Sequence, residues 1–269
     1  MNTPILSMPW AVYAAPGFLG SSALHAWGTM GRAAWSREYL ETSYESKGTP
    51  AMVAGSALDC LLTEGRVAYE SRYVVAPEGL DGRTKEGKAW KEANSGKAIL
   101  PASTAQEIES VLPLVNEALG IAQPDLSTLV FAPTYRGEIG SLKVQTRPDI
   151  AFLEADATTF LDLKYVNSQN FDAFSRQFAD SRYFLQAGLF WGLAGNNPSV
   201  SFLLAESGTD LPRVKGVQVP ERILSAGWDR CRKIVAEIVA AIESPQGITD
   251  AVSFEVLDLP AWAEARILD

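Results

Sequence analysis

The sequence predicts an α/β protein: a central mixed β-sheet flanked by helices, with a helical N-terminal portion. Two observations carry this prediction. Helical patterns dominate the first 120 residues, and segments rich in β-branched and aromatic residues begin near residue 127. With no internal repeat and no linker, we expect a single domain over residues 1–269. Its parts would be the helical portion 1–120, the sheet-bearing core 121–243 and a C-terminal tail 244–269.

Three helices are expected in the N-terminal portion. Gly20-Ser21-Ser22 would cap a helix that runs to residue 41, a second helix would run from Pro50 to a stop at Gly65, and a third would cover 104–119. The first 18 residues are interrupted by prolines and lack a basic start. We interpret them as a packed arm and not as a signal peptide.

The core is expected to begin with strands at 129–135, 141–154 and 158–166. Turns are predicted at Arg136-Gly137-Glu138 and Glu154-Ala155-Asp156. A helix over 171–194 would follow, then strands at 200–207 and 213–220 joined by a turn at 207–210, and a long helix over 221–243.

Composition excludes several classes of protein. At 47% hydrophobic and 20% charged residues, the chain is expected to pack rather than remain disordered. No apolar run approaches the ~18 residues that cross a bilayer, so no membrane association is expected. Cys60 and Cys231 are expected to be reduced, buried thiols of a cytoplasmic protein. No phosphate-binding loop of the Gly-x-x-x-x-Gly-Lys-Ser/Thr type is present, so an ATP-driven machine is not supported.

The residues with the clearest chemical meaning are Asp149 and, thirteen positions later, Asp162-Leu163-Lys164, on segments expected to be adjacent strands. Two carboxylates can hold a hard divalent cation such as Mg²⁺. Lys164 lies on the same face as Asp162, because side chains alternate along a strand. A metal ion and an ammonium group together could activate water for phosphodiester hydrolysis. A structural Asp–Lys ion pair is the alternative.

The helix expected after these strands adds polar candidates. Gln186 could orient the attacking water or Lys164, Arg182 could bind a phosphate, and Tyr183 lies beside them. The net charge of −9 argues against nucleic acid, but the segment 81–97 is locally basic and Arg147 lies next to the acidic residues. Arg83, Lys85, Lys88, Arg147 and Arg182 are therefore candidate DNA contacts. The alternative for the lysines is a solvated helix face.

In order and spacing, Asp149, Asp162-Leu163-Lys164 and Tyr183-Phe184-Leu185-Gln186-Ala187 resemble the PD-(D/E)xK nuclease superfamily. More narrowly, the chain resembles the RecE-type (exodeoxyribonuclease VIII-like) phage and prophage exonucleases. Further matching segments are 55–59, 61–64, 83–90 and 259–262.

The resemblance implies a restriction-endonuclease-like core and a Mg²⁺-dependent exonuclease, with Mn²⁺ as a second usable ion. Such enzymes resect linear duplex DNA from the 5′ end for phage-type recombination. A homo-oligomer, a single-strand annealing protein as partner, and a cytoplasmic location in a bacterial host are implied as well. On this basis Asp149 and Asp162 bind the metal, Lys164 assists the attacking water, and Gln186 with Tyr183 completes the site.

The chain departs from the family at several positions. Asp59 stands where the family has histidine, and as an oxygen donor it is a candidate third metal ligand, with Glu64 nearby. Glu138 is the candidate for a glutamate that the family has before the Arg-Pro-Asp segment. Phe190 and Tyr165 replace a tyrosine and a threonine. These departures keep two other functions open: a catalytically inactive DNA-binding or assembly module with the same fold, and a structural phage protein.

Overall fold

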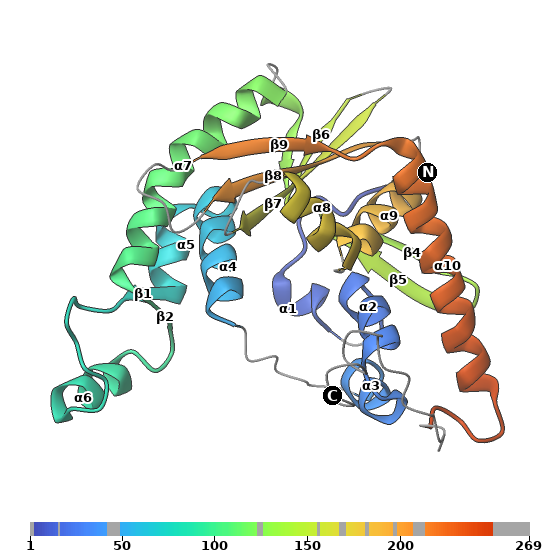
Figure 1. The fold of residues 1–269 in the computed structure, drawn as a ribbon, viewed down its shortest axis with the longest axis horizontal. Coiled ribbons are helices and arrows are strands. Elements are labelled where there is room, and N and C mark those ends of the chain that lie inside the picture. Colours follow the sequence, from blue (N-terminus) through green and yellow to red (C-terminus); the bar gives the residue numbers. More distant parts are fainter. Residues whose placement is uncertain are drawn as a thin grey trace, which may run out of the picture.

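The computed structural model describes residues 3–15, 17–41, 49–122, 126–154, 157–166, 171–180, 183–195, 198–206 and 213–249. The predicted fold class is confirmed, because a mixed five-stranded sheet lies at the centre with helices on both faces (Figure 1). Its strand order is β3-β6-β7-β8-β9. The strands are β3 (Leu129–Phe131), β6 (Ile150–Leu153), β7 (Thr158–Val166), β8 (Ser199–Glu206) and β9 (Val214–Gln218).

Strand β7 is the axis of this sheet. It pairs antiparallel with β6 on one side and parallel with β8 on the other. The parallel connection is made through α8 (Phe171–Asp180) and α9 (Tyr183–Ala194), as a parallel crossover requires. Alternate residues of β7 point to opposite faces, so Phe160 and Val166 enter one core while Leu161 and Leu163 enter the other.

The first core is closed by α9 and by α10 (Glu221–Glu243), which pack side by side, together with α2 (Ser21–Thr29) and α3 (Arg32–Tyr39). Trp35, fully buried on α3, packs edge-on against Trp27 of α2. Gly188 of α9 and Gly227 of α10 allow the two helix backbones to approach closely. This face carries the side chains at even-numbered positions of β7, including Asp162 and Lys164.

The second core is closed by α4 (Pro50–Thr63), α5 (Gly65–Arg72) and α7 (Ala102–Ala122). The Thr49 side chain caps α4 by accepting from the N–H of Met52, and Pro50 occupies the first turn. The fully buried residues Leu58 and Ile108 belong to this core. In Figure 1 these helices form a limb on one side of the sheet.

The remaining elements are small. A parallel pair, β1 (Tyr73–Val75) and β2 (Ala98–Leu100), holds the loop that carries α6 (Lys85–Ala93) at the tip of the limb (Figure 1). An antiparallel hairpin, β4 (Tyr135–Ile139) and β5 (Leu142–Thr146), packs on α9, and the short helix η1 (Leu126–Thr128) precedes β3. Helix α1 (Trp10–Tyr13) lies in the N-terminal arm.

Two expected helices are divided in the structure. The expected helix to residue 41 is α2 and α3, separated at Met30 and Gly31, whose extended backbones end the first helix and cap the second. The helix expected over 171–194 is α8 and α9, and residues 181–182 lie outside the described part.

The second expected helix is confirmed as α4, but α5 begins directly after it at Gly65, whose φ of +84° suits glycine. The long helix over 221–243 is confirmed as α10.

The strand expected over 141–154 is also two strands. Pro148 cannot donate a ladder hydrogen bond, so β5 ends before it and β6 begins after it in a different sheet. The turn predicted at Arg136-Gly137-Glu138 is wrong, because those residues lie within β4. The reversal falls instead at Gly140, which has a φ of +59°.

Several expectations fall on residues that the structure does not describe. These are the turn at 207–210, most of the turn at 154–156, and the tail from 250 onward. Within the described residues, no helix is long and apolar enough to cross a membrane. Cys60 and Cys231 are free and buried, as expected.

Candidate active site

The pairing of β6 with β7 brings the two predicted aspartates together. Ile150 is the register partner of Leu161, so Asp149, the residue before β6, lies opposite Asp162 and on the same face. Asp149 Oδ2 accepts a 2.7 Å hydrogen bond from the backbone N–H of Leu163. Asp162 is fully buried. Two carboxylates are therefore fixed side by side at the end of β6.

A third carboxylate, that of Asp59 on α4, interacts electrostatically with Asp149 and Asp162. The pKa of Asp59 is raised from 3.8 to about 6, mainly by burial and in addition by the charge of Asp162. Burial also raises the pKa of Asp149 well above its usual value, and Asp162 and Asp59 add to that shift. Three carboxyl groups that oppose one another's ionisation in a desolvated place need a cation to be stable in the charged form.

Lys164 supplies one positive charge. Its ammonium forms an ion pair with Asp162 Oδ2 and lies 4.9 Å from the centroid of the Tyr183 ring and 5.6 Å from that of Phe202. Burial lowers the pKa of Lys164, but the carboxylates of Asp162 and Asp149 outweigh burial, so the net pKa is raised. Lys164 is therefore charged at neutral pH.

Gln186 completes the contacts of Asp162. It projects from α9 and donates a 3.0 Å hydrogen bond from Nε2 to Asp162 Oδ1. Its Oε1 is buried and has no hydrogen-bonding partner among the described residues. An amide held at one end and open at the other can accept a hydrogen bond from water or a ligand.

Arg147 adds a second positive charge beside the carboxylates. Its charge lowers the pKa of Asp59 and of the Tyr13 hydroxyl, so it lies within electrostatic range of both. Its Nη1 is buried and, within the described part of the chain, has no hydrogen-bonding partner. A half-buried arginine whose Nη1 has no partner in that part of the chain is suited to bind an anionic ligand.

The donor atoms fit a hard divalent cation. Asp59 Oδ1 and Gln186 Oε1 are buried oxygens without hydrogen-bonding partners among the described residues. Gln186 contacts Asp162 directly, and Asp59 lies within electrostatic range of Asp149 and Asp162. As the described side chains lie, no three His, Cys, Asp or Glu groups form a complete metal-binding cluster. Mg²⁺ needs no such cage, because it is commonly held by one or two carboxylates together with water and substrate phosphate. Asp149 and Asp162 would hold it, with Asp59 as a further oxygen donor.

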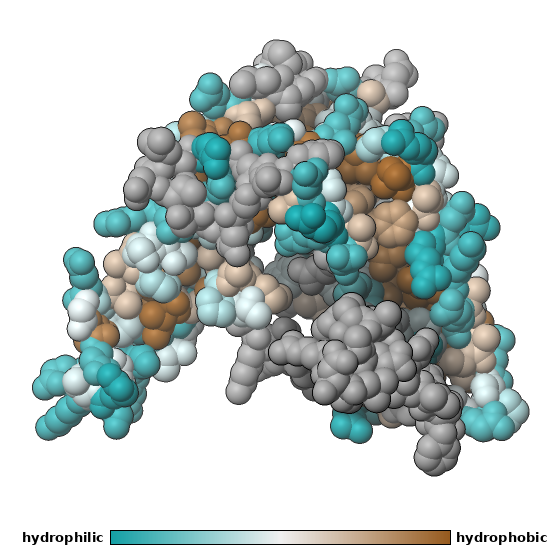
Figure 2. Space-filling view, in the orientation of Figure 1, coloured by the Kyte–Doolittle hydropathy of each residue, from teal (hydrophilic) through white to brown (hydrophobic). Residues whose placement is uncertain are grey.

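Figure 2 shows a hollow in the surface beside α4, below the sheet in the orientation of Figure 1.

The fold of this chain resembles that of a known protein. It superimposes on the crystal structure of the "Putative exonuclease" from Eubacterium rectale with a TM-score of 0.60 and 12% sequence identity, over 94% of this chain and 96% of that one. The likeness is one of fold.

Other comparisons add little. The alkaline exonuclease LHK-Exo from Laribacter hongkongensis gives a TM-score of 0.33 and 12% identity over 61% of this chain and 85% of its own, which is too low to support an argument. Its complex with dAMP gives 0.33 and 12% over 60% and 84%. The sequence matches no family model and no curated protein.

The other basic candidates are placed differently. Lys85 and Lys88 lie on α6, and Arg83 precedes it and pairs with Asp81 at 3.1 Å. Figure 1 places α6 at the far tip of the limb, away from β7, and Figure 2 shows that tip as hydrophilic. Arg182 lies outside the described residues. A role of these residues in DNA contact stays a prediction.

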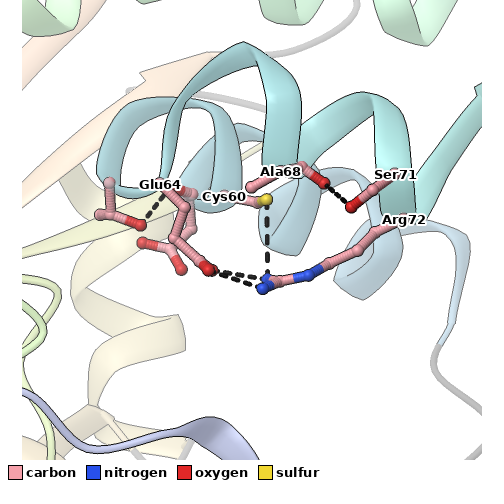
Figure 3. Close-up of polar contacts among 7 residues, drawn as sticks. Cys60, Glu64, Ala68, Ser71 and Arg72 are labelled. Atoms are coloured by element: carbon pink, nitrogen blue, oxygen red, sulfur yellow. Dashed lines mark hydrogen bonds and ion pairs between the residues drawn. The ribbon is translucent and has the colours of Figure 1, made fainter.

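Glu64, the further candidate near the metal side, and Tyr165, which departs from the resembled family, have structural partners of their own. Glu64 is held by Arg72 through two hydrogen bonds of 2.5 and 2.6 Å, and Arg72 also approaches Cys60 Sγ at 3.7 Å (Figure 3). Tyr165 points away from Asp162 and donates to Glu107 of α7 at 2.5 Å.

The two remaining positions are Glu138 and Phe190. Glu138 is exposed on β4, and Phe190 is fully buried in the first core. Neither is placed as a partner of the carboxylates.

Sequence reasoning missed the N-terminal arm. Trp10 and Tyr13 of α1 lie against Arg147, with its Cζ 5.9 and 5.5 Å from their ring centroids. Mainly through burial, the pKa of Tyr13 is raised to about 12; Arg147 lowers it, and Asp149 and Asp162 raise it slightly. The arm carries no periodic pattern, and more than 130 residues separate Tyr13 from Arg147, so no local signal could have joined them.

Proposed function

We propose that this protein is a Mg²⁺-dependent deoxyribonuclease, an exonuclease that hydrolyses the phosphodiester bonds of linear duplex DNA, with Mn²⁺ as an alternative ion. The observation that carries the proposal is the group of three mutually destabilising carboxylates, Asp59, Asp149 and Asp162, beside the ammonium of Lys164. The fold shared with the Eubacterium rectale protein, whose name describes an exonuclease, supports it.

Each residue has a role in this chemistry. Asp149 and Asp162 bind the metal ion, which when bound lowers the pKa of water and offsets charge on the phosphate. Lys164 is held against Asp162 and orients the attacking water or stabilises the developing negative charge. Gln186 fixes Asp162 through Nε2 and accepts a hydrogen bond from the water through Oε1.

Tyr183 and Arg147 support these groups. The face of the Tyr183 ring keeps the ammonium of Lys164 in place. Arg147 binds a phosphate of the DNA through its open Nη1. Arg83, Lys85, Lys88 and Arg182 are proposed as further phosphate contacts along the duplex.

The finer features of the proposal rest on the resemblance to RecE-type exonucleases. They are digestion from the 5′ end, a 3′ single strand left for an annealing protein, a homo-oligomeric assembly, and a place in phage-type recombination in the bacterial cytoplasm. End-labelled duplexes test the polarity directly, because a 5′ label is released early and a 3′ label late if digestion starts at the 5′ end.

One observation favours a second function. Lys164 already neutralises Asp162, and no complete metal-binding cluster is present among the described residues. A chain that kept the fold but lost the metal would be a DNA-binding or assembly module without cleavage. In that case the Asp–Lys contact is a buried structural ion pair.

Degradation of linear duplex DNA by the purified protein, with and without Mg²⁺ or Mn²⁺, separates these functions. We expect cleavage by the wild type and its loss in Asp162→Ala and Lys164→Ala. DNA binding without cleavage under either ion would support the module instead. Absence of both properties would point to a structural protein, and undiminished cleavage by Asp162→Ala would overturn the site assignment.

A further inference from the structure

Trp10 is the most exposed large aromatic residue in the part of the chain that the structure describes. It begins α1 and is 66% exposed. Other apolar side chains of the same arm, Ile5, Leu6 and Val12, are also exposed. An indole ring placed in solvent on an apolar segment indicates a surface that binds a partner or ligand.

The position of this ring is fixed by the hairpin β4–β5. Gln145 Nε2 donates to the backbone oxygen of Tyr13 at 2.7 Å, and Arg136 Nη2 donates to that of Val12 at 3.2 Å. Arg136 Nε also donates to Gln145 Oε1 at 3.0 Å, so both anchors belong to one network. The arm therefore presents Trp10 from a held backbone rather than from a free terminus.

Arg147 joins this aromatic surface to the carboxylates. Its Cζ lies 5.9 Å from the Trp10 ring centroid and 5.5 Å from that of Tyr13. Its Nη1, buried and without a partner among the described residues, is an open donor for an anion. An exposed flat ring and an open guanidinium donor thus lie within one side-chain length of each other.

A ligand that satisfies both groups must carry an anion bonded to a flat, stackable ring, which describes a nucleotide. An apolar peptide or a second copy of the chain could cover Trp10 but would leave Arg147 Nη1 unsatisfied at a buried position. Base-paired nucleotides have both ring faces covered, except at an end, so an unpaired nucleotide is the better match.

We propose that Trp10 and Arg147 form a subsite for one unpaired nucleotide beside the carboxylates, with the base stacked on the Trp10 ring and the phosphate bound by Arg147. This subsite deepens the proposed nuclease function and rests on it, since it defines the substrate as a strand whose end is unpaired before cleavage. Trp10 is then a positioning residue that aligns the strand.

The test is a double-mutant cycle that uses binding rather than cleavage. A fluorescently labelled single-stranded oligonucleotide is titrated with protein in EDTA, so that metal and hydrolysis play no part. The change in the protein is Trp10→Ala. The change in the oligonucleotide is an abasic nucleotide, placed in turn at the 5′ and the 3′ end. Trp10→Phe retains a ring, and Val67→Ala, at a residue 84% exposed on α5, is the control for loss of a surface apolar side chain.

We expect Trp10→Ala to weaken binding by about 5- to 100-fold, the effect of one lost base–aromatic contact. Trp10→Phe should recover most of this loss, and Val67→Ala should bind as the wild type does. The abasic nucleotide should weaken the wild type similarly at one of the two ends and should have no further effect in Trp10→Ala. That end also reports the polarity of the strand in the site.

If Trp10→Ala discriminates against the abasic end as strongly as the wild type does, the subsite is wrong. A change in oligomeric state without a change in binding would assign Trp10 to a contact between copies and would equally overturn the proposal. The nuclease function is judged separately, from cleavage in Mg²⁺. A positive cycle without cleavage would support the subsite in a binding module, whereas cleavage without coupling would support the nuclease alone.

Discussion

Asp149 Oδ2 accepts a 2.7 Å hydrogen bond from the backbone N–H of Leu163, so the first carboxylate of the site is tied to the strand that carries the second. The contact is possible because Asp149 continues the register in which Ile150 faces Leu161. This hydrogen bond holds the two acids at a fixed separation and uses only Oδ2 of Asp149. The charge and the strand contact of Asp149 can therefore be separated by substitution.

Asp149→Asn should keep the strand contact, because the amide oxygen can still accept from Leu163, while it removes one negative charge. We expect the unfolding temperature in EDTA at neutral pH to equal or exceed that of the wild type, because the neutral amide relieves the cost of burial and the repulsion from Asp162 and Asp59. The rise in unfolding temperature on adding Mg²⁺ should be much smaller, and cleavage should fall by about 100-fold or more. An equal Mg²⁺-induced rise in both proteins would show that Asp149 does not bind the metal.

Lys164→Met should destabilise the protein, because it leaves the buried Asp162 carboxylate without its cation. We expect a loss of about 3–5 kcal/mol in the free energy of unfolding in EDTA. Chemical denaturation measures it. The matched control is the double variant Asp162→Asn, Lys164→Met, which removes both charges and should be more stable than the single variant. A double variant less stable than Lys164→Met would contradict the ion pair.

Part of this site follows from local sequence pattern. Asp149, Asp162 and Lys164 lie on strands that follow one another in the chain, so side-chain alternation and antiparallel pairing are enough to place them on one face. Gln186 is on the next helix but one, and it reaches Asp162 because α9 packs on that same face. Short connections made these residues predictable.

The rest depends on long-range packing. Asp59 of α4 was a candidate only through the family resemblance, and Trp10 of α1 was not a candidate. Both are far from Asp149 in sequence, and no periodicity relates them to it. The prediction of one strand over 141–154 was wrong for a related reason. Apolar and β-branched residues continue on both sides of Arg147-Pro148-Asp149. Pro148 interrupts the strand, but the change of sheet depends on the pairing of β5 with β4 and of β6 with β7.

The raised pKa of Asp59 makes the metal-free protein less stable as pH rises. The folded state keeps its proton up to a pKa of about 6, whereas the unfolded carboxyl releases it near 3.8. The protonated form therefore stabilises the fold at low pH, and this stability is lost between about pH 4 and pH 6. The shift corresponds to at most about 3 kcal/mol.

Asp59→Asn removes this titration and is the variant to compare. In EDTA we expect it to be more stable than the wild type above pH 6 and to show a weaker decline between pH 4 and pH 6. Urea denaturation across this pH range measures both curves. Parallel curves for the two proteins would mean that Asp59 is not held in a desolvated, negatively charged place.

Helix α9, which carries Gln186, packs against α10, and this packing depends on Gly188. A Cβ added there would lie 2.3 Å from the backbone carbon of Gly227, and neither helix backbone can shift without disturbing the first core. We expect Gly188→Ala to lower the free energy of unfolding by about 1–3 kcal/mol, as overpacking does. Gly120→Ala is the matched control, because that glycine is exposed on α7 with no atom within 4 Å of a Cβ. Because alanine favours a helix more than glycine does, Gly120→Ala should raise the free energy of unfolding by up to about 1 kcal/mol. If chemical denaturation finds Gly188→Ala as stable as Gly120→Ala, the two helices do not approach as closely as the structure places them.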